Sequence, residues 1–192
     1  MLSREKNKKR ETLTNQAISQ PGCYLLLLRI EKNISLRVGK LGSFYLKAGY
    51  YAYAGSARKG LKGRITRYLS PAQKCFWHID YLLRHPEVRL EGLFLFPAVF
   101  FPELDEHILI KKLLEKGSKA VIPGFGSRDC REQCPAHLVK IPRKQKISSL
   151  FPRAIILTRL SGTARSISKN KLGKKENCDI TLQDEKITSR AN

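Results

Sequence analysis

The chain has 192 residues, 42% of them hydrophobic, a length that supports one buried core and favours a single domain with polar extensions. The formal net charge is +21, and the excess is spread along the chain, because residues 21–142 alone hold twenty basic and ten acidic side chains. Such a charge attracts nucleic acid or another anionic surface. We expect no membrane span, since no apolar run approaches the roughly 20 residues that a span needs.

The N-terminal residues and the cysteines predict a cytoplasmic protein. Residues 1–16 are charged and lack the apolar core of a signal peptide, so we expect none. The five cysteines are an odd number at scattered positions and do not resemble a disulfide framework. A reducing compartment fits this pattern best.

The first half of the chain predicts strands. Residues 1–19 are polar and basic, and we expect them to form a frayed N-terminal tail before a domain at 20–142. The apolar run at 23–30 predicts a strand that is buried on both faces, and 34–38 predicts a second strand that forms a hairpin with it. With a third strand around Tyr51 and Tyr53, these elements favour a small antiparallel sheet.

Helical patterns are more frequent in the second half. Apolar residues at helical spacing predict helices over 60–69 and 74–84, and a strand is predicted over 88–96. Pro102 stands at the position that favours a helix start, and Gly117 is expected to end that helix. Beyond the boundary that we place near 143, residues 143–192 form a basic extension that we expect to be largely disordered, with 154–160 apolar enough for a short helix or strand.

The stretch at 49–68 combines aromatic and basic residues. Tyrosines precede a turn at Gly55, and a basic helical segment follows it. A strand end that presents phenols beside a cationic helix start suits a phosphate-bearing substrate. The side chains that we expect to contact nucleic acid are Arg58, Lys59, Lys62, Arg67, Lys74 and His78.

Two tripeptides in this region resemble the pattern of the GIY-YIG nuclease family. Gly22-Cys23-Tyr24 begins the first predicted strand, Tyr53-Ala54-Gly55 ends the third, and Arg64 follows on a helix. Further matches indicate one subfamily, found mainly in archaea and some bacteria. They are RVGKLGSF at 37–44, AGYYAYAGSA at 48–57, WHIDYLL at 77–83 and PGFGSRDC at 123–130.

The resemblance implies an α+β fold with a three-stranded antiparallel sheet flanked by helices, and a divalent metal, Mg²⁺ or Mn²⁺, held by a helical glutamate. Glu106 is the expected ligand, and Glu103, one turn earlier, is the alternative. Tyr24, with a depressed pKa or transiently deprotonated near the metal, would act as general base. Tyr53 would hydrogen-bond the phosphate or the water, and Arg64 would neutralise charge on the phosphoryl oxygens.

Each of these residues also has a structural interpretation. Tyr24 and Tyr53 are residue types common in strands, Arg64 could be a solvated helix residue, and Glu106 could stabilise the helix dipole. Tyr68 stands where many relatives of the family have histidine.

Two functions follow from the resemblance. The first is a metal-dependent endonuclease acting on DNA, with RNA as the alternative partner, and structure-selective in repair or in defence against mobile elements. The second is a nucleic-acid-binding module that keeps the fold without efficient cleavage. A third hypothesis is a basic protein that associates with RNA or ribosomes through its tail.

Three residues near the predicted boundary have the spacing of metal ligands. Cys130, Cys134 and His137 could hold zinc if a fourth ligand came from His107 or His85. The competing interpretation is a loop in which Asp129 forms turns with backbone amides.

Overall fold

The computed structural model describes residues 15–70, 75–142 and 147–158. The helical elements are η1 (Gly39–Leu41), α2 (Leu61–Leu69), α3 (His78–Leu83), α4 (Glu106–Glu115) and α5 (Ile147–Leu150). The strands are β1 (Gly22–Ile30), β2 (Ile34–Val38), β3 (Gly42–Leu46), β4 (Gly49–Ala57), β5 (Val88–Pro97), β6 (Lys119–Ala120), β7 (Leu138–Ile141) and β8 (Ile155–Thr158). Among these described helices, none combines the length and the apolar character needed to cross a bilayer.

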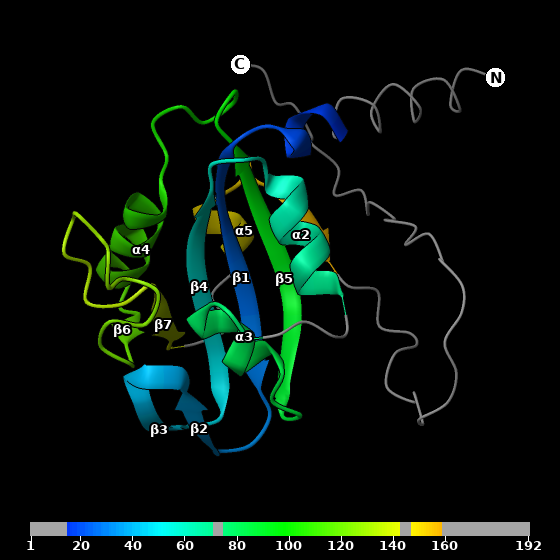
Figure 1. Cartoon of the computed structure of the whole chain (residues 1–192). Helices are drawn as coiled ribbons and strands as arrows, with labels where there is room; N and C mark the ends of the chain where they lie inside the picture. Colours follow the sequence, from blue (N-terminus) through cyan, green and yellow to red (C-terminus); the bar gives the residue numbers. More distant parts are fainter. Residues whose placement is uncertain (1–14, 71–74, 143–146, 159–192) are drawn as a thin grey trace, which may run out of the picture.

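The main sheet confirms the predicted α+β class and antiparallel pairing but not the predicted size. Its strand order is β6-β7-β4-β1-β5-β8, six strands rather than three, and every recorded pair is antiparallel. The predicted hairpin between β1 and β2 is also wrong, because β2 pairs with β3 in a separate two-stranded sheet. β1 instead lies between β4 and β5 at the centre of the main sheet (Figure 1).

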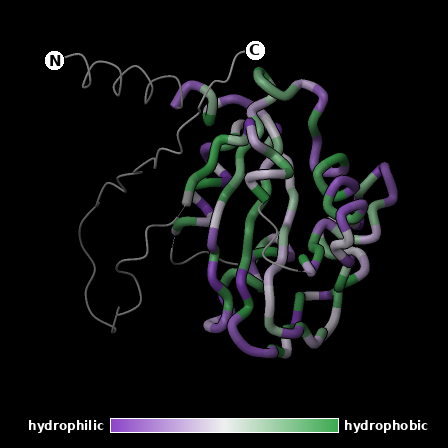
Figure 2. Tube along the Cα trace, turned by 180° about the vertical axis from the view of Figure 1, so that it is seen from behind, coloured by the Kyte–Doolittle hydropathy of each residue, from purple (hydrophilic) through white to green (hydrophobic). Residues whose placement is uncertain are grey.

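The central position of β1 explains its unbroken apolar sequence. Side chains of a strand alternate between the two faces of its sheet. Leu26 and Leu28 join the core beneath α2 and α3, whereas Leu25 and Leu27 join the core beneath α4 and α5. The strand is therefore buried on both faces, as the sequence predicts. Figure 2 shows green stretches along the central strands, with pale and purple segments between them.

Two helices begin later than the sequence suggests. α3 begins at His78 rather than at residue 74, since Asp80 accepts hydrogen bonds from the amides of Phe76 and Trp77 and so holds the residues before the helix in another conformation. α4 begins at Glu106 rather than at Pro102, because Asp105 is its N-cap and accepts a hydrogen bond from the amide of Ile108 at 2.8 Å.

The chain continues the same fold past the boundary that the sequence places near 143. β8 pairs with β5 and extends the main sheet to residue 158, and Ile147 and Phe151 are buried in the core beneath α4 and α5. At the other end, residues 15–19 are helical and bury Ala17 and Ile18. Of the predicted tails at 1–19 and 143–192, residues 1–14, 143–146 and 159–192 lie outside the described residues.

Candidate active site

A pocket of about 1060 Å³ lies at the edge of the main sheet where β7 begins. β7 pairs with β4 only over Tyr50–Tyr53, and the next residues of β4, from Gly55 to Ala57, line the pocket. Because the pocket sits at this edge, it receives side chains from both faces of the sheet. α2 and α3 contribute from one face and the start of α4 from the other, and residues 126–137 complete the wall.

The four residues proposed for catalysis all line this pocket. They come from separate elements: Tyr24 from β1, Tyr53 from β4, Arg64 from α2 and Glu106 from the first turn of α4. Glu103, the alternative carboxylate, is exposed, precedes α4 and is not among the lining residues. The fold thus brings together side chains that are up to 82 positions apart in sequence.

At both glycines of the two tripeptides, a side chain would collide with atoms of the neighbouring strand. Gly55 pairs with Tyr24 across the sheet, and a Cβ at Gly55 would lie 2.4 Å from the Tyr24 hydroxyl. A Cβ at Gly22 would lie 2.3 Å from the carbonyl oxygen of Phe96. Only glycine leaves room for the phenol of Tyr24 beside β4 and for the close approach of β1 to β5.

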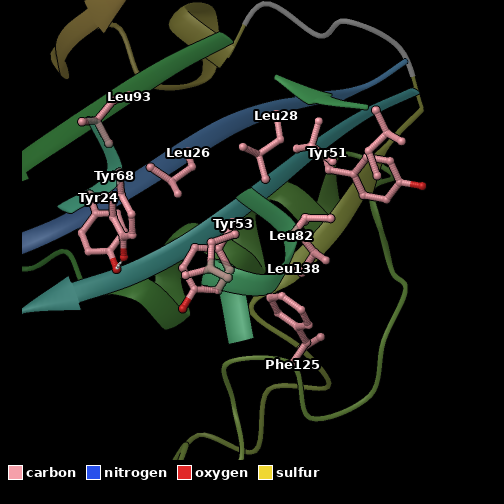
Figure 3. Close-up of a cluster of buried hydrophobic side chains, with 14 of the residues drawn as sticks. Tyr24, Leu26, Leu28, Tyr51, Tyr53, Tyr68, Leu82, Leu93, Phe125 and Leu138 are labelled. Carbon is pink, nitrogen blue, oxygen red and sulfur yellow. Dashed lines mark hydrogen bonds between the residues drawn. The ribbon is translucent and has the colours of Figure 1, made fainter. Parts of the chain in front are cut away.

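Tyr24 and Tyr53 are almost enclosed. They expose 2% and 6% of their surface, and the Tyr24 hydroxyl forms a 2.5 Å hydrogen bond with the hydroxyl of Tyr68. Figure 3 shows the Tyr24 and Tyr68 hydroxyls side by side and the Tyr53 hydroxyl directed away from the leucines of the core.

Burial raises the pKa of Tyr24 well above its ordinary value, Tyr53 and Tyr68 raise it further, and the guanidinium of Arg64 opposes the shift. Burial likewise raises the pKa of Tyr53, again against the effect of Arg64. Desolvation therefore outweighs the nearby cation in the protein alone. The depressed phenol pKa that the family resemblance implies is one for a phenol beside a bound metal ion. Both side chains are neutral phenols at neutral pH.

Glu106 is the first residue of α4. Its Oε1 accepts a hydrogen bond of 3.0 Å from the hydroxyl of Ser56 on β4. Its side chain keeps 18% of its surface exposed, so the carboxylate reaches the pocket from a fixed position. The N-terminal end of a helix also favours a negative charge at this position.

Arg64 lies against Trp77, with its guanidinium carbon 4.6 Å from the centre of the indole ring. Trp77 is 41% exposed and lines the pocket. Phe76 beside it is 75% exposed. The spacing of aromatic residues in the sequence does not tell whether they face the core or the solvent, so it could not predict this exposed pair beside a guanidinium.

The residues predicted to contact nucleic acid divide into four groups. Arg58 and Lys59 line the pocket, whereas Lys62 is exposed on α2 and does not. Arg67 and His78 line it but already have protein partners: the guanidinium of Arg67 forms two hydrogen bonds with Asp80, and His78 Nδ1 accepts from the amide of Gly126 at 3.0 Å. Lys74 lies outside the described residues.

The loop before β7 supplies basic residues that the sequence did not single out. Arg128 and Arg131 line the pocket beside Asp129 and Glu132. In total the lining holds six lysines and arginines and four acidic residues, so the pocket is net positive. These two arginines stand in a segment without helical or strand periodicity, where sequence offers no signal for the direction of a side chain.

A cluster of thiols and imidazoles borders the same pocket. His107 follows Glu106 on α4 and lies beside Cys130, Cys134 and His137. Of the two candidates for a fourth ligand, the fold selects His107 and leaves His85 outside the cluster.

Comparison with known families assigns the chain to one of them. The model of the family described as domain of unknown function DUF123 matches residues 23–159, more than two thirds of the chain. The chain therefore belongs to this family. No curated protein and no solved structure matches it.

Proposed function

We propose that this member of the DUF123 family is a metal-dependent endonuclease of the GIY-YIG type that hydrolyses phosphodiester bonds in DNA. The observation that carries the proposal is the meeting of Tyr24, Tyr53, Arg64 and Glu106 on the wall of one pocket. Two phenols, a guanidinium and a carboxylate are the groups needed to orient water, neutralise a phosphate and hold a hard cation.

The charge of the pocket supports a phosphate-bearing substrate. Arg58 and Lys59 directly follow β4, and Arg128 and Arg131 line the same pocket from the loop before β7. Such cations attract a polyanion and fix its backbone without reading its sequence. The net charge of +21 extends this attraction over the whole chain.

The exposed aromatic rings support a substrate with unpaired bases. Trp77 is half-exposed at the pocket and Phe76 lies against it, with ring centres 4.9 Å apart. Bases stack on such rings whatever their identity, and each stack contributes about 1–3 kcal/mol. We therefore place branched, flapped or single-stranded DNA ahead of intact duplex among the substrates.

The donors around Glu106 fit a hard divalent cation. Mg²⁺ takes oxygen ligands and commonly uses one or two carboxylates, with water and substrate phosphate completing its shell. Glu106 offers a partly exposed carboxylate, and Asp105 and Asp129 line the same pocket. A cation held there would supply Lewis-acid activation of the phosphate and a more acidic water.

The chain's own residues then have separate tasks. Arg64, held against Trp77, neutralises charge that accumulates on the phosphoryl oxygens. Tyr53 and Tyr24, which remain protonated, donate or accept hydrogen bonds that orient the phosphate and the attacking water. This assignment replaces the phenolate base of the family resemblance with a neutral phenol.

The second candidate function is a binding module without efficient cleavage. One observation favours it: Tyr24 exposes only 2% of its surface, and its hydroxyl is already bonded to Tyr68. A phenol that stayed in this arrangement with substrate bound would contact no water. The basic and aromatic lining would still bind nucleic acid.

Cleavage assays with matched carboxylate variants test the proposal. Purified protein is incubated with branched, flapped, single-stranded and duplex DNA in Mg²⁺ or Mn²⁺, with EDTA controls. We expect cleavage that EDTA abolishes, and a loss of about 10²-fold or more in Arg64→Ala and Glu106→Gln with DNA binding retained. Glu103→Gln, outside the pocket, is the control and should cleave like the wild type.

Two results would change the conclusion. Unimpaired cleavage by both Arg64→Ala and Glu106→Gln would show that the catalytic residues are assigned wrongly. Tight DNA binding by the wild type without cleavage in any metal would establish the binding module in place of the nuclease.

A further inference from the structure

We propose that His107, Cys130, Cys134 and His137 form a tetrahedral site for a structural Zn²⁺ ion. One nitrogen or sulfur atom from each residue lies within 4.8 Å of those of the other three. The inference does not rest on the proposed nuclease activity, because it uses none of the four residues assigned to the reaction.

The distances in the cluster are close to those that a bound ion requires. His107 Nδ1 lies 3.3 Å from the sulfur of Cys130 and 3.7 Å from the sulfur of Cys134. Zinc bonds of about 2.1 Å to nitrogen and 2.3 Å to sulfur in a tetrahedron separate the ligand atoms by about 3.3–3.8 Å. The site therefore needs small side-chain adjustments and no rearrangement of the backbone.

A buried imidazole nitrogen points independently to a ligand. His137 is 5% exposed, and its Nε2 has no hydrogen-bond partner among the described residues. A buried polar atom without a partner is costly, so such atoms in folded proteins usually have one that is not yet identified. The ring of His137 lies 5.4 Å from that of His107, and a metal ion between them would satisfy this nitrogen.

The kinds of donor select zinc over the cation expected at Glu106. Two thiolates and two imidazoles are soft and borderline ligands, which bind Zn²⁺ tetrahedrally, whereas Mg²⁺ requires oxygen. Four protein ligands leave no open position for a substrate, so the site is closed and structural. The carboxylate of Glu106, with Oε1 3.9 Å from His107 Nε2, would then lie beside the ligand's second nitrogen.

The local backbone also suits a metal-binding turn. The amide of Cys134 donates to the sulfur of Cys130 at 3.4 Å, a contact that stabilises a thiolate. Gln133, immediately before Cys134, has a positive φ of 51°, which closes the turn between the two cysteines. Both cysteines are unpaired and lie side by side on this turn.

The ion would join the loop before β7 to the helix α4. Cys130 and Cys134 belong to the loop that carries Arg128 and Arg131, and His107 belongs to α4 beside Glu106. Binding at this site would hold the loop against the helix and fix the distance between the basic wall of the pocket and its carboxylate. The coordination is thus a support for the site rather than a part of its chemistry.

Metal content of the purified full chain is the direct test. After dialysis, elemental analysis and native mass spectrometry should find one zinc ion per chain. Cys130→Ser and Cys134→Ser should each lose most of it, whereas Cys75→Ser, a free cysteine outside the cluster, should retain it.

Cobalt substitution in the wild type gives a readout that does not depend on the folding of a variant. Replacing the bound ion by Co²⁺ should produce a thiolate-to-cobalt charge-transfer band and the strong visible bands of tetrahedral Co²⁺. Loss of zinc should also lower the midpoint of thermal unfolding, since the ion stabilises the folded state.

Three results would overturn the proposal. The first is a wild-type chain that neither contains zinc nor binds added zinc or Co²⁺ in the reduced state. The second is unchanged zinc content in Cys130→Ser and Cys134→Ser. The third is a Cys130–Cys134 disulfide in protein purified under reducing conditions. Because none of these measures DNA cleavage, failure here is distinguishable from failure of the nuclease proposal.

Discussion

The phenol of Tyr24 lies between two other tyrosine rings, with ring centres 6.5 Å from Tyr53 and 5.4 Å from Tyr68. This surrounding is apolar, so the phenolate form loses more hydration than the single guanidinium of Arg64 returns. Removing its proton at neutral pH would therefore be costly. A neutral hydroxyl can still donate one hydrogen bond and accept another, which suffices to orient a water molecule.

We predict that Tyr24→Phe lowers the cleavage rate by about 10²-fold, as expected for the loss of one positioned hydrogen-bonding group. Wild-type cleavage should show no rise with pH that depends on Tyr24, because the raised pKa keeps the phenol protonated well past neutrality. Rates measured from pH 6 to 10 on both proteins check this, and Tyr45→Phe, on an exposed ring outside the pocket, is the control. A tenfold rise per pH unit in the wild type that disappears in Tyr24→Phe would instead identify a phenolate base.

At the scale of elements, sequence periodicity predicted the individual strands better than their partners. The apolar run of β1 indicates burial on both faces, and β5 is predicted to within one residue of its ends. The pairing of β1 with β2 was wrong because only three residues separate them, and proximity in sequence favours a hairpin. β2 is amphipathic and pairs with β3, while the apolar β4 and β5 cover both edges of β1.

The candidate site was predictable only where a motif fixes the spacing. The tripeptides and the following arginine identified Tyr24, Tyr53 and Arg64, which the fold places at one pocket. The exposure of Trp77 was not predictable, because an aromatic residue at helical spacing looks the same whether it faces core or solvent. The choice of His107 over His85 likewise depends on how α4 docks, and no local pattern encodes that contact.

Asp80 links α2 to α3 and to the residues before α3. Its carboxylate binds the guanidinium of Arg67 and accepts hydrogen bonds of 2.8 Å from the amides of Phe76 and Trp77. Burial alone would raise the pKa of Asp80, but the hydrogen bonds from Arg67, Trp77 and Phe76 lower it below its ordinary 3.8. This carboxylate therefore links α2, which carries Arg64, to Trp77 at the start of α3.

We predict that Asp80→Asn lowers the free energy of unfolding by about 2 kcal/mol, because hydrogen bonds to a buried charge are lost. Glu87→Gln, which removes the pair with exposed Lys32, is the matched control and should cost less than about 1 kcal/mol. Urea titrations monitored by circular dichroism measure both values.

The same variant has an effect that depends on pH. Since the pKa of Asp80 is lowered in the folded state, its contribution to the free energy of unfolding is present above pH 3.8. That contribution is lost as pH falls through the folded pKa. The stability difference between wild type and Asp80→Asn should therefore shrink in acid. Equal losses in Asp80→Asn and Glu87→Gln would contradict a special role for Asp80.

At the scale of the whole molecule, positive charge occurs both in the part of the chain that the structure describes and in the residues after it. Residues 159–192 hold eight lysines and arginines and four acidic residues, and residues 21–142 hold twenty and ten. Either region could bind nucleic acid on charge alone. Only binding at the pocket brings a phosphate to Arg64 and Glu106. Which of the two regions binds DNA therefore decides between a nuclease domain and a protein that binds through its tail.

The salt dependence of DNA binding shows which residues contact the DNA phosphates. Each phosphate contact that is made contributes about 0.9 to the slope of log affinity against log salt concentration, so Arg128→Ala and Arg131→Ala should each reduce the slope by about 1 and weaken binding to all sequences alike. Fluorescence anisotropy on one flapped DNA over a series of salt concentrations gives the slopes. Lys32→Ala, a highly exposed lysine outside the pocket, should leave the slope unchanged.

A chain that lacks residues 159–192 should keep most of the slope if the pocket binds the DNA. If that truncation alone removes the slope while both arginine variants bind like the wild type, the tail carries the affinity, and the pocket is not where nucleic acid binds.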